Sequence, residues 1–382
     1  MAPKATTDRL RIGYLSADFH SHATSFLLAE VMELHDHHRF ETLGYSCGLD
    51  DNTPMQKRIR AAFTHFYDIQ TLSIEAAAGK IADNRVDILV DLLGYTRSNR
   101  HQIFSLRPAP VQVNWLGYPG TMGHERLADY LIGDPVVTPL THAAFYSETL
   151  ALMPHCNQPN DRQKEIGLSR TRDTFNLPEQ GFVFCSFNQS VKITPVVFDL
   201  WCRLLKAVPG SVLWLLEDDR DVVQMNLRHE AALRGIAPER LVFAGNLPLA
   251  EHLARLRLAD LMLDTFPYTS HTTASDALWV GLPLVTCIGE TFASRVAASL
   301  LHAAKMPELI TTTFDDYFRL ALDLATHPDK LATIKDTLAT HRLTCPLFDS
   351  ARFTRDLERL YERMWADHLS GRKKTINLAD ES

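Results

Sequence analysis

Short apolar runs alternate with amphipathic segments of helical length along almost the whole chain, and this alternation limits the possible folds more than any other feature. Continuous apolar strands separated by helices are typical of parallel sheets that are covered on both faces. A polar stretch, residues 157–174, divides the runs into two series. We therefore predict an α/β fold with two doubly wound, Rossmann-like domains that face a cleft. The expected strands are residues 11–18, 40–47, 86–94, 111–119 and 128–134 in the first series, and residues 182–188, 211–218, 240–246, 259–266 and 282–287 in the second.

The predicted domain limits follow from these two series. The first domain is expected over residues 1–165 and the second over residues 175–350. Near the end of the chain, FTRDLERLYERMW has apolar residues at spacings of three and four, which predicts an amphipathic helix. This helix, placed at about 351–370, is a candidate to pack back on the first domain. The tail that follows, residues 371–382, is expected to be frayed.

Composition excludes several classes of protein. The net charge of −7 gives no electrostatic case for binding nucleic acid or a lipid surface. No apolar run is long enough to span a membrane, and the N-terminus lacks the apolar run of a secretory signal. The six cysteines are scattered without CxxC pairing, which argues against a disulfide framework or a structural zinc site. We expect a cytoplasmic location.

Polar or glycine-rich segments follow five of the predicted strands. Ligands of parallel α/β sheets bind at the carboxyl ends of the strands. Because these segments come from both halves of the chain, they predict an active site between the two domains. The segments are SADFHSHATS, GYTRSNRH, GYPGTMG, FNQSVKITP and TFPYTSHTT.

The segment LDTFPYTSHTTASDALW predicts a strand that ends at Asp264, a polar loop and a helix that begins near Thr272. The first N–H groups of a helix lack internal partners and attract an anion, and a diphosphate fits such a site. Asp276, one turn further on, is placed to accept hydrogen bonds from ribose hydroxyls. The alternative is an ordinary connection with hydroxyl capping, in which Asp276 only complements the helix dipole.

Five longer motifs resemble the catalytic region of the O-linked N-acetylglucosamine transferases and of the related Spindly-type protein O-fucosyltransferases. The resemblance extends over residues 10–367 and implies a GT-B fold, a nucleotide-sugar donor and inversion at the anomeric carbon. It also implies transfer to Ser or Thr hydroxyls of proteins, without a metal or another cofactor. The motifs are RIGYLSADFHSHATS, RPAPVQVNWLGYPGTMG, FNQSVKITP, LDTFPYTSHTTASDALWVGLPLVT and GETFASRVAASLL.

The resemblance assigns the second domain to the donor. Lys192 corresponds to the family lysine that offsets the charge growing on the departing diphosphate; on its own it would be an ordinary solvated lysine. His252 corresponds to the histidine that stacks on the uracil, with Arg255 nearby, but Leu249 stands where a family lysine contacts the base. The donor nucleotide is therefore open at this point. The residues implied to hold the diphosphate and the ribose are Gln189, His271, Thr272, Thr273 and Asp276.

The resemblance assigns the first domain to the acceptor. His22 corresponds to the histidine beside the acceptor hydroxyl, and a neutral imidazole can accept or position its proton. The donor phosphate and an aspartate are other candidates for the base, and a solvated loop histidine is the alternative for His22. Asp87 stands where animal enzymes carry a histidine, and it orients a neighbour, accepts a proton or only caps the strand.

Further residues are expected to line or support the donor pocket. Gly117 and Pro119, in GYPGT, correspond to the loop near the donor sugar, and Tyr95 and Thr96 are expected to line the same pocket. Arg295 is interpreted as a structural or supporting residue. The DxD pattern within EDDRD, residues 217–221, is interpreted as a charged loop, because it directly follows an apolar strand and precedes a helix. The other histidines show no paired spacing with carboxylates on one helix face, so no metal site is expected.

The chain also departs from the family. Tetratricopeptide repeats, which family members usually carry before the catalytic region, do not occur here. The chain is then a shortened form, a compact member or a unit that needs a separate protein to dock its acceptor. Our prediction is transfer of N-acetylglucosamine from UDP-N-acetylglucosamine to Ser or Thr of proteins. The alternatives are a fucosyltransferase that uses GDP-fucose or another sugar nucleotide, and a nucleotide-sugar-binding scaffold with little turnover.

Overall fold

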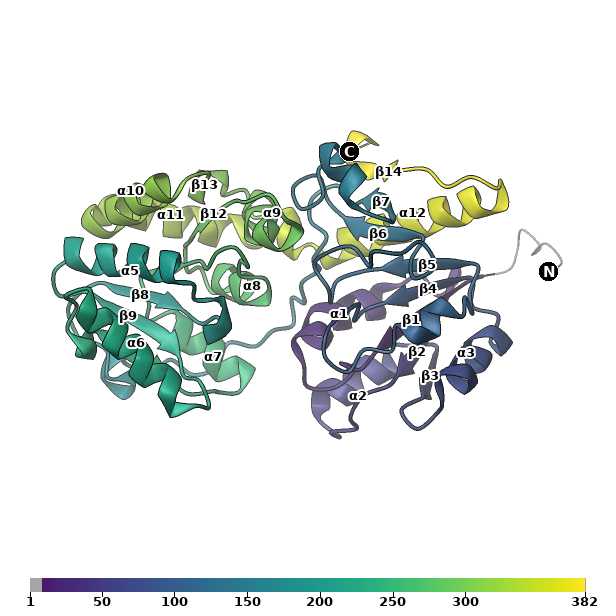
Figure 1. The fold of residues 1–382 in the computed structure, drawn as a ribbon, viewed down its shortest axis with the longest axis horizontal. Helices are drawn as coiled ribbons and strands as arrows, with labels where there is room; N and C mark the ends of the chain where they lie inside the picture. The colour runs from purple at the N-terminus through teal and green to yellow at the C-terminus, as the bar shows by residue number, and fades with distance from the viewer. Residues whose placement is uncertain (1–8, 382) are drawn as a thin grey trace. The chain divides into compact units, whose positions relative to one another are not determined.

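The computed structural model describes residues 9–381, and these residues form two compact units. The first unit comprises the described residues up to Gln163 together with those from Pro346 onward, and the second spans Lys164–Cys345. Each unit has a parallel sheet of its own with helices on both faces (Figure 1).

The first unit contains an eight-stranded sheet in the order β14-β7-β6-β5-β4-β1-β2-β3, and every pairing in it is parallel. Its strands are β1 (Leu10–Ser16), β2 (Phe40–Ser46), β3 (His65–Asp68), β4 (Ile88–Asp91), β5 (Val111–Asn114), β6 (Tyr130–Gly133), β7 (Thr149–Leu152) and β14 (Ile376–Asn377). Its helices are α1 (Ala23–Leu34), α2 (Pro54–Ala61), α3 (Ile74–Asp83), α4 (Gln102–Ser105) and α12 (Ser350–Leu369).

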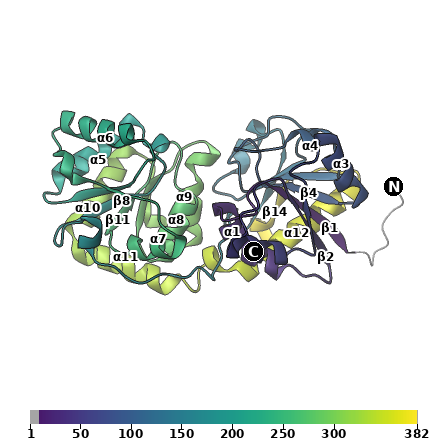
Figure 2. The same ribbon diagram turned by 90° about the horizontal axis from the view of Figure 1, so that it is seen from below.

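Alternation along these strands builds two cores, one on each face of the sheet. Ile12 and Tyr14 of β1 belong to the core that α1, α2 and α12 cover, whereas Leu15 belongs to the core under α3 and α4. Helix α12 comes from the end of the chain but lies beside α1, and β14 then adds a strand next to β7 (Figures 1 and 2).

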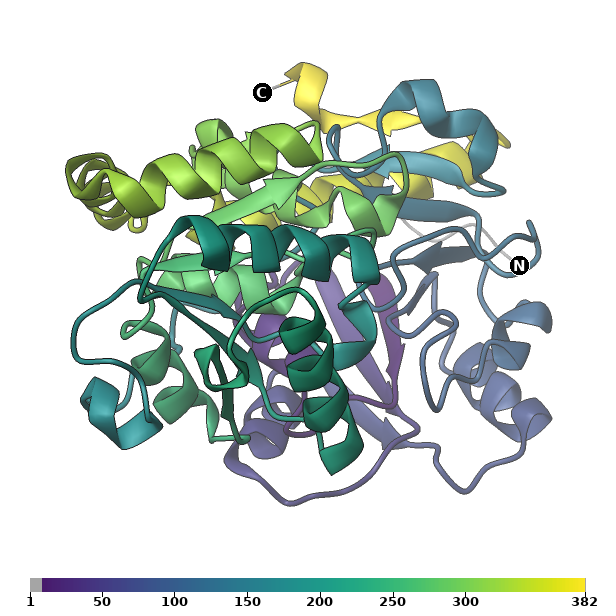
Figure 3. The ribbon, with the colours of Figure 1, turned by 60° about the vertical axis from the view of Figure 1, so that its left-hand side comes forward.

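The second unit contains a six-stranded sheet in the order β10-β9-β8-β11-β12-β13, shown at the front of Figure 3. Its strands are β8 (Val183–Ser186), β9 (Val212–Leu216), β10 (Leu241–Ala244), β11 (Leu261–Leu263), β12 (Leu284–Cys287) and β13 (Ile310–Thr311). Its helices are α5 (Pro195–Ala207), α6 (Asp221–Leu233), α7 (Leu249–Leu256), α8 (Thr272–Trp279), α9 (Val296–Ala303), α10 (Phe314–Thr326) and α11 (Pro328–His341).

Both sheets reverse their winding direction at one point. In the first unit the reversal lies between β1 and β4, and in the second it lies between β8 and β11. Loops at the carboxyl ends of the two strands that flank such a point leave a crevice where doubly wound folds bind their ligands. The reversal points therefore give one candidate site region in each unit.

The doubly wound α/β architecture predicted from the apolar runs is confirmed, because each of the expected segments contains a strand. The tail prediction is wrong. Residues 376–377 form β14, and the side chain of Leu378 is fully buried in the core of the first unit. Within residues 9–381, every helix is too short or too polar to cross a membrane.

Candidate functional site

A buried carboxylate organises the loop after β11 in the second unit. Asp264, which is 2% exposed, accepts hydrogen bonds from the Thr265 and Ser270 amides at 2.8 and 2.7 Å. It also accepts from the hydroxyls of Ser270 and Thr286, both at 2.6 Å. Burial raises its pKa, and these hydrogen bonds partly oppose the rise. Asp264, at the end of β11, thus fixes the conformation of the loop that leads into α8.

Lys192 extends from the short helical turn after β8 toward this loop. Its Nζ donates to the carbonyl oxygen of Thr269 at 3.0 Å and to Oδ1 of Asn188 at 3.3 Å. The ammonium also lies 4.2 Å from the centre of the Tyr268 ring, a cation–π distance. Burial lowers the pKa of Lys192 to about 8, and the negative charge of Asp264 opposes this effect. The structure therefore holds one cation in place at the switch point of the second sheet.

Helix α8 begins beside this cation with its first amides unoccupied. Ala274 and Ser275 donate to the carbonyl oxygen of His271, and no side chain caps the helix, so the Thr272 and Thr273 amides point out of its start. His271 stacks on Tyr268, with ring centres 4.9 Å apart. Burial and the charge of Lys192 lower the pKa of His271 to about 3, so this ring is neutral at physiological pH. The arrangement suits an anion.

Asp276 lies one turn into α8 and is 6% exposed. Its Oδ1 accepts a hydrogen bond of 2.9 Å from the ammonium of Lys164, a residue that the sequence did not single out. Asp276, the residue that the sequence assigned as the ribose ligand, is thus one member of a buried ion pair.

His252 and Arg255, both on α7, form a third element of the second unit. Arg255 donates from Nε and Nη2 to Nδ1 of His252 at 3.1 and 2.9 Å, which leaves the ring proton on Nε2. Phe187, just after β8, contacts the His252 ring edge-to-face and lies under the Arg255 guanidinium. Burial and the charge of Arg255 lower the pKa of His252 to about 4, so the ring stays neutral.

Three further features of the second unit were named from the sequence. Gln189 is exposed just before the turn that carries Lys192. Arg295 donates to the carbonyl oxygen of Gly289 at 2.7 Å, which fits its interpretation as a structural residue. In the charged loop after β9, Asp218 accepts from Arg220 and Ser190, and the hydrogen bonds from Arg220 lower its pKa.

In the first unit, His22 caps the start of α1. Its Nδ1 accepts from the Thr24 amide at 3.3 Å, and the same atom lies 3.2 Å from the Thr24 hydroxyl and 3.5 Å from Oδ2 of Asp18. The ring is 44% exposed. Partial desolvation lowers the pKa of His22, the Asp18 charge opposes this and the charge of His20 adds to it. A neutral imidazole therefore stands at the carboxyl end of β1.

The loops after β4 and β5 pack against each other in the same unit. A side chain at Gly117 would lie 2.0 Å from the Leu92 carbonyl oxygen, so only glycine fits this close approach. Tyr95 donates to the carbonyl oxygen of Met122 at 2.7 Å and contacts Tyr118 edge-to-face.

Two predicted residues complete these loops. Pro119 lies in the turn after Tyr118 and is partly buried. The Thr96 hydroxyl oxygen is buried and has no hydrogen-bond partner among residues 9–381. An unpaired buried hydroxyl is what a ligand-lining position would leave in the absence of its ligand.

Asp87 does not join either group of loops. It precedes β4 and accepts a 2.7 Å hydrogen bond from the Arg11 amide, so it lies at the amino end of the strand. The strand-capping alternative for Asp87 fits this geometry.

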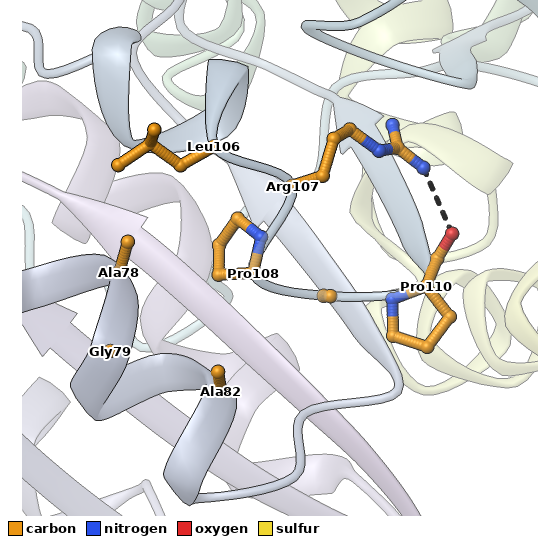
Figure 4. Close-up of a pocket in the computed structure, with 8 residues that line it drawn as sticks. Ala78, Gly79, Ala82, Leu106, Arg107, Pro108 and Pro110 are labelled. Carbon is orange, nitrogen blue, oxygen red and sulfur yellow. Dashed lines mark hydrogen bonds between the residues drawn. The ribbon is translucent and has the colours of Figure 1, made fainter. Parts of the chain in front are cut away.

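A surface pocket of about 590 Å³ in the first unit lies elsewhere, between α3 and the segment that precedes β5 (Figure 4). None of the predicted site residues lines it, and its walls are mostly apolar. Within the described part of the chain, no three His, Cys, Asp or Glu side chains are grouped to hold a metal ion. Metal independence stays a prediction.

Comparison with known proteins identifies the family. The model of glycosyl transferase family 41 matches residues 2–166 and 156–357 of this chain. The chain belongs to glycosyl transferase family 41. A probable UDP-N-acetylglucosamine–peptide N-acetylglucosaminyltransferase of Arabidopsis thaliana, SEC, is 40% identical over 96% of this chain and 38% of its own length. The SPINDLY protein of Petunia hybrida, named as the same probable activity, is 31% identical over 95% of this chain and 39% of its own.

Solved structures agree with the family 41 assignment. An O-GlcNAc transferase mutant from Thermobaculum terrenum superposes with a TM-score of 0.89 at 33% identity, over 96% of this chain and 69% of that one. Sucrose-phosphate synthase of Thermosynechococcus elongatus shares the fold alone, with a TM-score of 0.64 at 13% identity. The two units are thus the two Rossmann-like domains of the GT-B class. The chain spans about two fifths of the length of the curated relatives.

The structure brings Lys192 and His271, both named from the sequence, to one switch point, but sequence reasoning missed the residues that hold them. Asp264 and Tyr268 stand inside a motif that was recognised, so a polar residue at a strand end was the available signal for Asp264. Lys164 stands in the polar connecting stretch, and nothing in its local sequence marks it.

Proposed function

We propose that this chain transfers N-acetylglucosamine from UDP-N-acetylglucosamine to Ser or Thr hydroxyls of proteins, with inversion at the anomeric carbon. The observation that supports this most directly is the cation at the open start of α8. The Lys192 ammonium and the Thr272 and Thr273 amides lie together there. The chain that carries them belongs to family 41. Positive charge and unpaired amides there stabilise the diphosphate as the glycosidic bond breaks. The named activity of the SEC and Thermobaculum relatives supports the choice of sugar and acceptor.

In this mechanism the neutral His22 accepts or positions the proton of the acceptor hydroxyl, since its lowered pKa keeps it unprotonated at physiological pH. The neutral ring of His252 stacks on the nucleotide base, and Asp276 accepts from the ribose. The proposal needs no metal or other cofactor. We place the protein in the cytoplasm, with a nucleotide sugar and a protein as its substrates and a separate docking protein as a further partner.

The first experiment is calorimetric binding of UDP and of GDP, without added metal, to the wild type, Lys192→Ala and Lys206→Ala. Lys206 is an exposed lysine of α5 and serves as the matched control. We expect UDP to bind the wild type and Lys206→Ala alike, and to bind Lys192→Ala at least tenfold more weakly, because a charge-assisted hydrogen bond is lost (about 1.5–3 kcal/mol). A preference for GDP would move the assignment to the fucosyltransferase alternative.

The second experiment is transfer from UDP-N-acetylglucosamine to a library of Ser- and Thr-containing peptides, followed by mass spectrometry. A peptide that gains one N-acetylhexosamine with the wild type, and about 10²–10³-fold more slowly with Lys192→Ala, supports the proposal. Nucleotide binding without any transfer would favour the scaffold alternative, and a folded wild type that binds neither nucleotide would overturn the donor site.

A further inference from the structure

Lys164 is the first residue of the second unit, where the polar connecting stretch enters it. Its ammonium lies 2.9 Å from Oδ1 of Asp276, and the two side chains are 2% and 8% exposed. Among residues 9–381, the Asp276 carboxylate accepts no other hydrogen bond. Charged side chains are almost never buried unless they are paired, so each of these two side chains depends on the other for its burial.

Helix α8 holds Lys164 at a second point. The indole Nε1 of Trp279 donates to the Lys164 carbonyl oxygen at 3.3 Å. Asp276 and Trp279 are three residues apart on α8 and therefore share a face of the helix. Both the backbone and the ammonium of Lys164 are fixed to this face of α8. The ammonium is therefore held in one place, whereas that of a surface lysine moves through solvent.

The pair is not required for packing. A well-packed apolar pair of similar volume is often as stable as a buried ion pair or more stable, whereas a buried carboxylate that loses its cation is strongly destabilised. Packing alone therefore does not explain a charge at this position. The same helix offers its open N-terminus to an anion one turn away, which connects the pair to the donor site.

We propose that Lys164 is a positioning residue of the donor site. Its ammonium holds Oδ1 of Asp276, so that the carboxylate keeps one orientation and directs Oδ2 to the ribose hydroxyls of the nucleotide. The inference rests on the proposed function, because it assumes that a ribonucleotide occupies the start of α8. Lys164 acts through Asp276 and does not itself touch the nucleotide.

The test is a cycle of variants and ligands. UDP, 2′-deoxy-UDP and 3′-deoxy-UDP are titrated into the wild type, Lys164→Met, Lys164→Arg and Asp276→Asn. Arg172→Met is the matched control, since it removes the 2.9 Å ion pair with Asp260 in the same unit at a distant strand end. We expect Lys164→Met to weaken UDP binding about tenfold, the size of one hydrogen bond to a charged group. Lys164→Arg should restore part of this loss, and Arg172→Met should bind as the wild type does.

The deoxy ligands separate positioning from a structural role. The wild type should lose affinity when one of the hydroxyls is removed, and Lys164→Met should no longer distinguish that ligand from UDP. Equal weakening of all three ligands by Lys164→Met would overturn the inference, and so would unchanged UDP binding. If Lys164→Met does not fold, the double variant Lys164→Met/Asp276→Asn is compared with Asp276→Asn, and the two should bind UDP equally. If the wild type binds no UDP, the proposed function itself is refuted, and the role of Lys164 that rests on it falls with it.

Discussion

The two units use the same strand order but build different loops at their switch points. In the second unit, Asp264 follows the strand beside the reversal and accepts four hydrogen bonds of 2.6–2.8 Å. In the first unit, Asp91 ends the corresponding strand and accepts two, from the Leu93 and Gly94 amides at 2.9 and 3.0 Å. The histidines nearby differ in the same sense, since His271 is partly buried and the side chain of His22 is 44% exposed.

This difference fits the two substrates of the proposed reaction. A diphosphate has the same shape in every turnover, so its site gains from a framework that is fixed before the ligand arrives. A protein acceptor presents a different surface each time, and an exposed side chain with long contacts can adjust to it. We therefore expect the second unit to lose more stability than the first when their matched residues are changed.

The largest effect is expected for Asp264. Asp264→Ala leaves two amides and two hydroxyls without their acceptor, each at a cost of about 1–3 kcal/mol with partial relaxation. We expect a loss of about 3–5 kcal/mol in the free energy of unfolding of the second unit, and about 1–3 kcal/mol for Asp91→Ala in the first. Urea unfolding followed by tryptophan fluorescence and circular dichroism measures both. Equal losses would break the comparison.

An intermediate effect is expected for His22. His22→Ala should lower the rate of transfer about 10²-fold while UDP binding stays unchanged, since the residue belongs to the unit assigned to the acceptor. Because the pKa of His22 is lowered, its neutral form persists through neutral pH, and the rate should fall only as the medium becomes acidic. The pH profile of kcat and a UDP titration measure these effects. His20→Ala, two residues away, is the control, and an equal loss in that variant would contradict the role of His22.

Much of this architecture could be predicted because it depends on local patterns. Apolar runs of strand length fixed the positions of the strands, and their order along the chain predicted the doubly wound sheets. Four short strands, β3, β7, β13 and β14, escaped prediction. The side chains of β3 are exposed or partly exposed, so it shows no apolar run. Strands β13 and β14 have only two residues each, and β14 pairs with β7 after α12 has returned across the unit.

The site was predictable where its residues share one motif and not where they come from distant segments. His271, Thr272 and Thr273 are neighbours in the sequence, and the start of a helix explains them locally. Lys164 meets Asp276 across 112 positions, and a single sequence holds no signal of such a pair. Asp87 is a different case, since its motif position left several roles open and the hydrogen bond from the Arg11 amide at the amino end of β4 fits strand capping.

The smallest expected effect concerns Tyr268, whose ring contacts the Lys192 ammonium and stacks on His271. Lys192 is charged below its pKa of about 8, so UDP affinity should be constant below that pH and fall above it as the ammonium loses its proton. The face of the Tyr268 ring stabilises the ammonium by about 0.5–2 kcal/mol. Tyr268→Leu therefore lowers the pKa of Lys192, and the fall in affinity should begin at a lower pH.

Calorimetry of UDP binding between pH 6.5 and 9 measures this change. Tyr268→Phe keeps the ring and should reproduce the wild-type profile, whereas Lys192→Arg should show no fall in this range because its guanidinium stays charged. If UDP affinity depends on pH in the same way in Tyr268→Leu and Tyr268→Phe, the ring does not stabilise the Lys192 ammonium. That ammonium is then held by Asp264, Asn188 and Thr269. In the first unit the direction is reversed, since burial lowers the pKa of His22 and its protonation is expected to affect the rate on the acidic side instead.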